Sequence, residues 1–264
     1  MRITSLESTP FSTVRYLAAA SGGGTATLSL PILRGRVDAL PTSLDALVVA
    51  SDLQGIELGG ARRLLGEALA DELGRLAGDG QLPPLERVGV LLAGDLYSAP
   101  NADRRGATGD VRAVWRALAA RCRFVAGVAG NHDTFGDRDD EARFRRELGV
   151  HLLDGDVAEL DTLRIGGVGG IIGDPHKPAR RDEREFVRAL RGVLAERPPV
   201  VVLHHGPDAE RGALRGHEAV RHALDRSGEL LVVCGHVHWR TPLADVRGGA
   251  QALNVDGRVV VLTA

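Results

Sequence analysis

The sequence predicts an α/β fold with mainly parallel strands, and two observations support this class. Short apolar runs rich in Val, Ile and Leu alternate with segments whose apolar residues recur at helical spacing, which is typical of βαβ units. The chain has 264 residues, of which 44% are hydrophobic and 26% charged. This composition is sufficient for a buried core and argues against a disordered or fibrous protein.

Five apolar runs predict the strands, at residues 46–50, 87–92, 124–128, 200–203 and 230–234. Leucines recurring at helical spacing over residues 65–76 predict a helix after the first strand. Further helices are predicted over residues 111–120 and 186–194, and Pro198-Pro199 ends the last of them. Residues 242–262 contain short strand-like segments with turn signals at Gly248-Gly249 and Asp256-Gly257, which predicts an antiparallel finish.

The chain contains no internal repeat and no long linker. We therefore expect a single domain over residues 1–264. Within it, residues 1–43 are an N-terminal extension that adds edge strands.

Charge and cysteine usage restrict the class of partner and the compartment. Lys and Arg total 33 against 35 acidic residues, a formal net charge of -2, which argues against a protein that binds nucleic acid through its overall charge. Cys122 and Cys234 lie far apart, each beside or within an apolar run, so buried free thiols are expected rather than a disulfide or a cysteine-based zinc site. With no signal-peptide pattern and no apolar run of about 20 residues, we expect a cytoplasmic protein without a membrane partner.

Residue types that commonly bind metals follow each of the five predicted strands. The clusters are Asp52-Leu53-Gln54-Gly55, Gly94-Asp95, Gly130-Asn131-His132-Asp133, His204-His205-Gly206-Pro207 and Gly235-His236-Val237-His238. Any one of them alone is an ordinary turn or helix cap. In open α/β sheets, however, ligand sites form beyond the carboxyl ends of the strands. The five clusters together therefore predict one metal-binding crevice.

In this order the clusters resemble the motifs of the calcineurin-like metallophosphoesterases, also called binuclear metallophosphatases. The family pattern is D-x-H, then G-D, then G-N-H-[DE], then a strand ending in His, then G-H-x-H. The resemblance spans residues 46–262. It implies a four-layer αββα sandwich of two mixed sheets flanked by helices, with two divalent metal ions between the strand ends.

The resemblance also implies a ligand set for each ion. The first ion would be held by Asp52, Gln54, Asp95 and His238. The second would be held by Asp95, Asn131, His236 and one histidine of the pair 204/205. Asp95 would then bridge both ions, which suits a carboxylate because it has two oxygens.

Two histidine assignments follow from the same resemblance. His205 is favoured as the ligand because it begins the run His205-Gly206-Pro207, and His204 stays open. Adjacent strand residues point to opposite faces, so only one of the pair is expected to bind the ion directly. His132 matches the family position that protonates the leaving oxygen or steadies the transition state.

The implied reaction is hydrolysis of a phosphomonoester, phosphodiester or diphosphate by a metal-bridging hydroxide, with His132 as the general acid. The expected partner is a phosphate-ester substrate such as a nucleotide, and nucleic acid enters only as a substrate. Protein phosphatases of the family extend the second motif to G-D-x-V-D-R-G, whereas this chain continues as Leu96-Tyr97-Ser98-Ala99-Pro100. Protein serine/threonine phosphatase activity is therefore disfavoured.

The chief departure from the family pattern is Gln54, where most members have histidine. A neutral amide oxygen favours Mn²⁺ as the ion, with Fe, Zn, Ni and Co also open. The alternative hypothesis is a non-catalytic interaction module of the same fold with a weakened first metal site.

Basic residues in polar loops have two interpretations: they face the crevice and hold a second phosphate, or they are solvated surface charges. These residues are Arg104, Arg105, His176, Lys177, Arg180 and Arg181.

Overall fold

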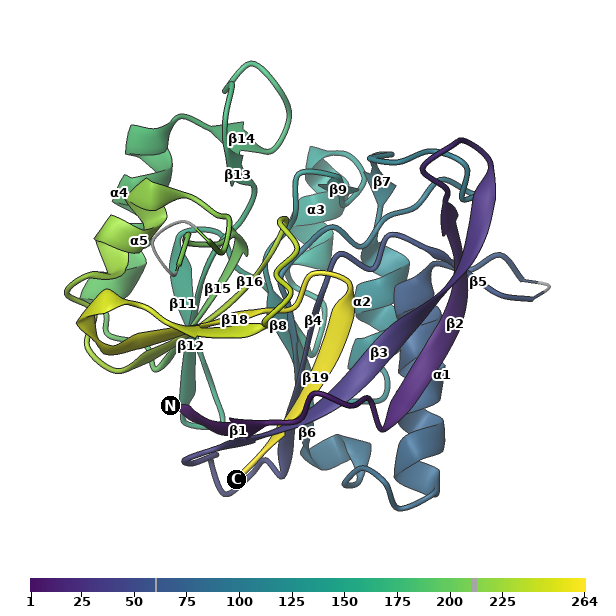
Figure 1. Cartoon of the computed structure of the whole chain (residues 1–264), viewed down its shortest axis with the longest axis horizontal. Coiled ribbons are helices and arrows are strands. Elements are labelled where there is room, and N and C mark those ends of the chain that lie inside the picture. The colour runs from purple at the N-terminus through teal and green to yellow at the C-terminus, as the bar shows by residue number, and fades with distance from the viewer. Residues whose placement is uncertain (60, 210–212) are drawn as a thin grey trace.

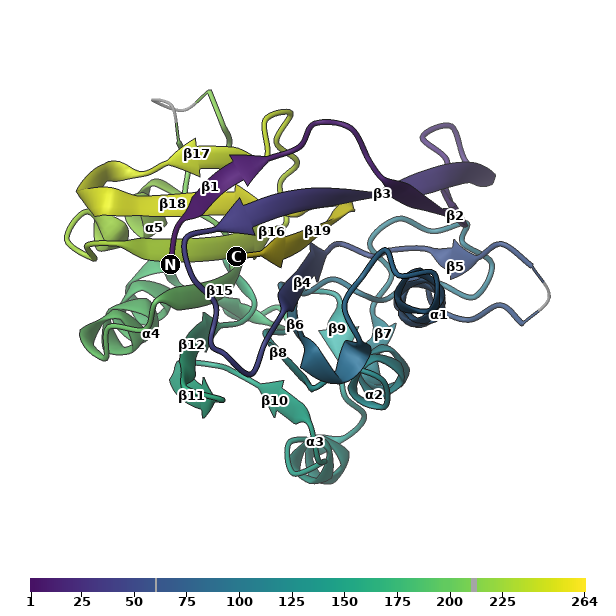
Figure 2. The same ribbon diagram turned by 90° about the horizontal axis from the view of Figure 1, so that it is seen from below.

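Two mixed β-sheets face each other at the centre of the molecule, and helices cover both outer faces (Figures 1 and 2). The structure is a computed structural model that describes residues 1–59, 61–209 and 213–264. The four layers are those of the αββα sandwich that the sequence motifs implied.

The first sheet contains the first three of the five predicted strands. Its order is β10 (Val150–Leu152), β8 (Phe124–Gly127), β6 (Val88–Leu92), β4 (Ala46–Ser51), β19 (Arg258–Thr263), β3 (Thr25–Val37), β2 (Ser12–Ala19) and β5 (Ile56–Glu57), and β1 (Ile3–Leu6) also pairs with β3. The four strands from β10 to β4 are parallel to one another. Their carboxyl ends therefore lie at the same edge of the sheet.

The second sheet has a parallel centre and antiparallel margins. Its order is β11 (Asp156–Leu160), β12 (Leu163–Val168), β15 (Val200–His205), β16 (Leu230–Gly235), β18 (Ala250–Asn254) and β17 (Leu243–Asp245). β12, β15, β16 and β18 are parallel, whereas β11 and β17 each join antiparallel.

Helices pack on the outer face of each sheet. They are α1 (Leu65–Gly78), α2 (Arg112–Ala119) and α3 (Arg138–Phe144) on the first sheet, and α4 (Glu183–Ala195) and α5 (Glu218–Leu224) on the second (Figure 2). Short elements complete the described chain: the pairs β7 (Gly109–Asp110) with β9 (Asp133–Thr134) and β13 (Ile171–Ile172) with β14 (Arg180–Arg181), and two 3-10 turns at Leu85–Arg87 and Arg247–Gly249.

Three apolar clusters hold the layers together. One lies between the first sheet and its helices, one between the two sheets, and one between the second sheet and α4 and α5. The helical spacing read in residues 65–76 is confirmed, because Leu65, Leu69, Leu73 and Leu76 are all fully buried against the first sheet. Burial of such side chains contributes about 1.5–3 kcal/mol each.

All five predicted strands are present, and β15 and β16 each run further than predicted, ending at His205 and Gly235. β2 and β1 lie toward the margin of the first sheet, as expected for the N-terminal extension. β3, in contrast, lies inside the sheet, where it pairs parallel to β19 and antiparallel to β2. The extension thus supplies an interior strand as well as marginal ones.

The predicted antiparallel finish is right for one turn and wrong for the other. Gly248-Gly249 joins the antiparallel pair β17 and β18. Asp256-Gly257 makes no hairpin, because β18 belongs to the second sheet and β19 to the first. At this point the chain crosses between the sheets, and Asp256 forms a bridge beside Ser51 at the end of β4.

Two smaller predictions concern the cysteines and the membrane. Cys122 and Cys234 are both buried free thiols, as expected. Among the described helices, none is both long enough and apolar enough to span a bilayer.

Candidate metal centre

The loops that follow β4, β6, β8, β15 and β16 meet where the two sheets adjoin. The Asp52 amide donates to the Gly94 carbonyl at 2.9 Å, which joins the first two loops. The His236 amide donates to Oδ2 of Asp52 at 2.9 Å, which joins the second sheet to the first. Parallel strands thus bring residues from five sequence positions into one crevice, as the motif order predicted.

The carboxylate of Asp133 fixes two of these loops to each other. It accepts hydrogen bonds from the backbone amides of Asp95, Leu96 and Gly130 at 2.7–2.8 Å. Gly130 leaves no room for a side chain, since a Cβ there would lie 2.0 Å from Oδ1 of Asp95. Asp133 is therefore a structural residue of the Gly130-Asn131-His132-Asp133 motif, and the loops are locked around Asp95.

The backbone turns sharply at three residues of the crevice. Asp52, Asp95 and His236 have φ angles of 54°, 57° and 69°. For non-glycine residues this left-handed region costs about 1–3 kcal/mol each and persists where surrounding contacts enforce it. The hydrogen bonds of the neighbouring loops supply that enforcement, and strained positions of this kind cluster at functional sites.

Asp95 lies at the centre of the crevice and is 3% exposed. Its Oδ1 accepts from the His132 amide at 2.9 Å, and its Oδ2 lies 3.0 Å from Nε2 of Gln54 and 3.4 Å from Nε2 of His204. Burial by itself would raise the pKa of Asp95, but the charge and hydrogen bond of His204 and the His132 amide lower it. Asp95 therefore stays ionised at neutral pH.

Asp95, His204 and His236 present one ligand atom each within 4.8 Å of one another. Nδ1 of His204 lies 2.7 Å from the Ala93 carbonyl, which can only accept, so Nδ1 carries a proton. Burial lowers the pKa of His204 but the Asp95 carboxylate raises it, to about 10, so that without an ion Nε2 is protonated as well and faces Oδ2 of Asp95 at 3.4 Å. A cation bound at Nε2 would replace that proton. Oδ1 of Asn131 is buried and has no hydrogen-bond partner in the described chain, and the carboxylate that Nε2 of His204 faces, that of Asp95, lies 3.4 Å away. Unpartnered buried acceptors are rare, and this set of donors fits a divalent cation.

His205, the ligand favoured from the sequence, faces a different environment. Its Nδ1 accepts a hydrogen bond from the Ile172 amide at 3.1 Å, so the proton of the neutral ring lies on Nε2. Burial and the neighbouring His236 lower the pKa of His205 to about 3, which keeps the ring neutral. The group of converging ligand atoms contains His204, and not His205, together with Asp95 and His236.

The residues expected at the first ion are less closely grouped. Oδ2 of Asp52 accepts from Oγ of Ser51 at 2.7 Å and from the His236 amide, and burial raises the pKa of Asp52 to about 7. Gln54 turns its amide nitrogen, not its oxygen, toward Asp95; a half-turn of the amide exchanges the two. The His238 side chain is 60% exposed and lies outside the group formed by Asp95, His204 and His236.

Two residues that were not among the predicted site residues contact His238. Nδ1 of His238 lies 3.3 Å from the backbone oxygen of Asp256 and 3.7 Å from its Oδ1. The buried Arg258 guanidinium lies 3.1 Å from Nε2 of His238. Asp256 also lines the same pocket as Asp52 and Gln54. The sequence signal at Asp256 was that of a turn, and only the crossing between the sheets places this carboxylate beside the first ligand set.

The crevice opens into a pocket of about 470 Å³ whose lining includes Asp52, Gln54, Asp95, His132 and His236. The His132 ring lies at this opening, with Nδ1 3.3 Å from Oγ1 of Thr108. This volume is within the range of about 300–1,000 Å³ typical of small-molecule sites.

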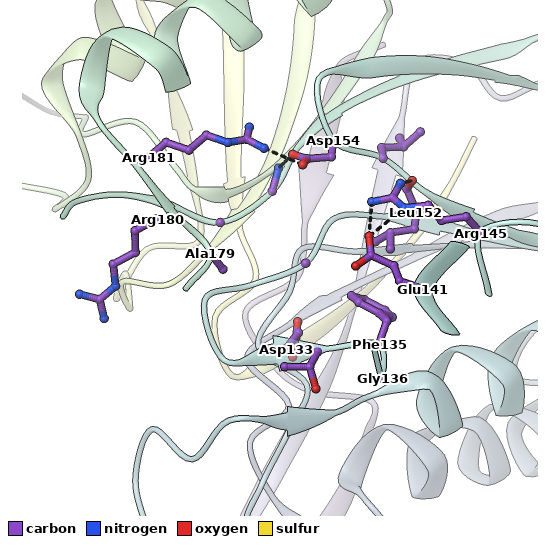
Figure 3. Close-up of a pocket in the computed structure, with 15 residues that line it drawn as sticks. Asp133, Phe135, Gly136, Glu141, Arg145, Leu152, Asp154, Ala179, Arg180 and Arg181 are labelled. Carbon is purple, nitrogen blue, oxygen red and sulfur yellow. Dashed lines mark hydrogen bonds and ion pairs between the residues drawn. The ribbon is translucent and has the colours of Figure 1, made fainter. Parts of the chain in front are cut away.

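A separate hollow of about 310 Å³ lies beside the crevice (Figure 3). Its charged side chains largely pair with each other: Arg181 with Asp154 at 2.6 Å and Arg145 with Glu141 at 2.9 Å. Arg180 points away from these pairs (Figure 3). None of the expected metal ligands lines this hollow, so the chemistry is centred on the crevice.

The fold and the donor set together fit a metal-dependent hydrolase as the class. The family model for calcineurin-like phosphoesterases matches residues 46–240. The chain therefore belongs to the calcineurin-like phosphoesterase family.

The fold is also found in one solved structure, and a second solved structure is more distantly similar. TT1561 of Thermus thermophilus is similar with a TM-score of 0.56 at 16% identity, covering 81% of this chain and 90% of that one. A 5'-nucleotidase precursor from the same organism has a TM-score of 0.42 at 16% identity, with 80% of this chain and 48% of that one covered. No curated protein matches the chain significantly.

Proposed function

We propose that the protein is a binuclear metal-dependent phosphoesterase. The observation that carries this proposal is the convergence of Asp95, His204 and His236 within 4.8 Å, together with the buried, unpartnered oxygen of Asn131. Carboxylate, imidazole and amide oxygen are the donors that first-row divalent ions take in proteins. The family acts on phosphate esters, which fits a crevice built to hold cations.

We assign the ligands in two half-sites that share Asp95. The buried half-site consists of Asp95, Asn131, His204 and His236, with His204 in the place for which the sequence had favoured His205. The open half-site consists of Asp52, Gln54, Asp95 and His238. Mn²⁺ is the proposed ion, because the amide oxygens of Gln54 and Asn131 are hard donors.

Two divalent ions, when bound, lower the pKa of a water molecule and neutralise charge on phosphate oxygens. The protein's own contribution is geometric. Asp133 holds the Asp95 and His132 loops together, so that the Asp95 carboxylate and the His132 ring keep a fixed relation. His132 lines the pocket together with Asp52, Gln54 and Asp95, and its Nδ1 lies 3.3 Å from Oγ1 of Thr108. It is therefore placed to give a proton to the leaving oxygen.

The proposal is tested by metal analysis together with hydrolysis of bis-p-nitrophenyl phosphate, with and without added Mn²⁺. We expect two ions per chain and a rate that disappears when a chelator removes them. Fewer than one ion per chain under saturating Mn²⁺, or hydrolysis that is insensitive to the chelator, contradicts the proposal.

A second candidate function is the non-catalytic interaction module, and one observation favours it. His238 lies against Arg258 and is largely exposed, so the open half-site is not assembled around a cation. A protein of this kind binds one ion per chain, at the buried half-site, and hydrolyses no ester. The same metal analysis and assay distinguish it from the phosphoesterase.

A further inference from the structure

The pocket at the metal centre has a second wall that lies outside the residues matching the family. Tyr16, Ala18 and Ala19 of β2 and Leu28 of β3 line the pocket together with Asp52 and Asp95, whereas the family match begins at residue 46. Tyr16 and Leu28 are directly opposite each other in the β2–β3 pair, so their side chains share one face of the hairpin. Leu28 is 45% exposed, which is unusual for a leucine in this chain.

Both tyrosines of the chain line this pocket. Each ring is seated against a glycine: a Cβ at Gly55 would lie 2.2 Å from the Tyr16 ring, and a Cβ at Gly109 would lie 2.3 Å from the Tyr97 ring. Gly55 directly follows Gln54. Two aromatic rings and an exposed leucine therefore stand beside the metal ligands, and such surfaces favour a planar apolar group such as a nucleobase.

Two arginines complete the wall. Arg104 and Arg105 are exposed and line the pocket. Within the part of the chain that the structure describes, neither forms an ion pair with a carboxylate, and Nε of Arg105 donates to the Ala19 carbonyl of the hairpin at 3.4 Å. By contrast, Arg181 pairs with Asp154, and His176 and Lys177 are exposed outside the pocket. Arg180 lines the separate hollow and not this pocket. Arg104 and Arg105 are thus the arginines of this pocket that are available to an anion.

The loop that carries Arg104 and Arg105 contacts His132, the residue proposed to protonate the leaving oxygen. A Cβ at Gly106 would lie 3.2 Å from the His132 ring, Thr108 contacts Nδ1 of that ring, and the Gly109 amide donates to the His132 carbonyl at 3.1 Å. If His132 protonates the leaving oxygen, a group attached to that oxygen extends along Arg104 and Arg105. An anion held there belongs to the leaving group.

We infer that the pocket binds a substrate whose leaving group carries its own phosphate and a planar ring, that is, a diphosphate ester in which a nucleoside monophosphate departs. This inference rests on the proposed function and deepens it. The oxygen of water forms the new bond to the outer phosphorus, the bond from that phosphorus to the bridging oxygen breaks, and the departing nucleotide phosphate takes a proton from His132. The products are two monophosphates, and no oxidant or reductant is needed.

The test measures binding of α,β-methylene-ADP, whose bridge cannot be cleaved in this way, and of inorganic phosphate to the Mn²⁺-loaded protein by titration calorimetry. Wild type is compared with the double variant Arg104→Gln/Arg105→Gln. The matched control is Arg15→Gln, on the same hairpin but adjacent to Tyr16 and outside the pocket lining. We expect the double variant to bind α,β-methylene-ADP at least about tenfold more weakly, because it loses the charge-assisted hydrogen bonds of both arginines to the leaving-group phosphate. Arg15→Gln should bind it like wild type.

The ring is tested by a second comparison in wild type, between α,β-methylene-ADP and methylenediphosphonate. We expect the nucleotide to bind more tightly, and Tyr16→Leu to reduce this difference, with thermal denaturation confirming that the variant is folded. Equal affinities of wild type and the double variant for α,β-methylene-ADP, or equal affinities of wild type for the two ligands, overturn the inference. Wild type that neither binds phosphate nor hydrolyses bis-p-nitrophenyl phosphate overturns the proposed function as well, so the two failures are distinguishable.

Discussion

The two half-sites that share Asp95 differ in how completely the protein assembles them. In the buried half-site, His204 is fully buried, with Nδ1 held by the Ala93 carbonyl and Nε2 facing Asp95, and the buried Oδ1 of Asn131 has no partner in the described chain. In the open half-site, His238 is 60% exposed and already contacts Asp256 and Arg258. One half-site has an unmet acceptor and the other has competing polar contacts.

This difference has an energetic consequence. A buried acceptor without a partner costs about 1–3 kcal/mol, and an ion bound at the buried half-site removes that cost. At the open half-site, an ion has to displace the Arg258 contact from His238 and turn the Gln54 amide before both become ligands. We therefore expect the buried half-site to bind its ion more tightly, and the open one to exchange its ion more readily.

The largest effect is expected at the residue the half-sites share. Asp95→Asn replaces a bridging carboxylate by a neutral amide with one donor oxygen. Activity toward bis-p-nitrophenyl phosphate should be lost and both ions should bind more weakly, as measured by rate and by metal content after dialysis. Near-normal turnover in this variant means that Asp95 does not bridge, and the division into half-sites is then wrong.

A variant of His132 separates the effect on catalysis from the effect on metal binding. His132→Ala should keep both ions, since the proposal gives its ring no ligand role, while turnover falls by about 10²- to 10⁴-fold as for loss of a general acid. The defect should be smaller for esters with good leaving groups, which need little protonation. An equal defect across a leaving-group series indicates a binding role instead.

Variants of His204 and His205 test which histidine binds the ion at the buried half-site. His204→Ala should weaken ion binding at the buried half-site by about 10- to 100-fold or more, because losses of that size follow even from removing a group that only supports a ligand. His205→Ala is the matched control, adjacent in sequence and also buried, and should retain the ion. Titrations with Mn²⁺ measure both. The reverse result would restore His205 as the ligand.

The smallest effect is expected at Gln54, in the open half-site. Gln54→Ala should weaken only the more weakly held ion, and Gln54→His should shift preference from Mn²⁺ toward Zn²⁺ or Ni²⁺, which favour imidazole. Occupancy and rate are measured for each variant with Mn²⁺ and Zn²⁺. Unchanged affinity, ion preference and rate in Gln54→Ala show that Gln54 is not a ligand.

The sequence by itself determined the fold class and the order of the motifs. Runs such as Ala46–Ser51 and Leu230–Gly235 are apolar enough to be buried strands wherever they lie, and a strand's carboxyl end is where its following loop must turn. The metal-binding residue types at the carboxyl ends of the five predicted strands therefore predicted a shared crevice from the sequence alone. Local chemistry sufficed because each element depends mainly on its own residues.

Only the tertiary structure decided which atoms face one another. His204 and His205 are indistinguishable as residue types, and the Ala93 carbonyl and the Ile172 amide, both remote in sequence, set their proton positions. Asp256 reads as part of a turn, and the crossing of the chain from β18 to β19 brings it beside β4. Contacts between distant segments carry no local signature, because they arise from packing two sheets together, so the register of strands and the direction of side chains had to come from the fold.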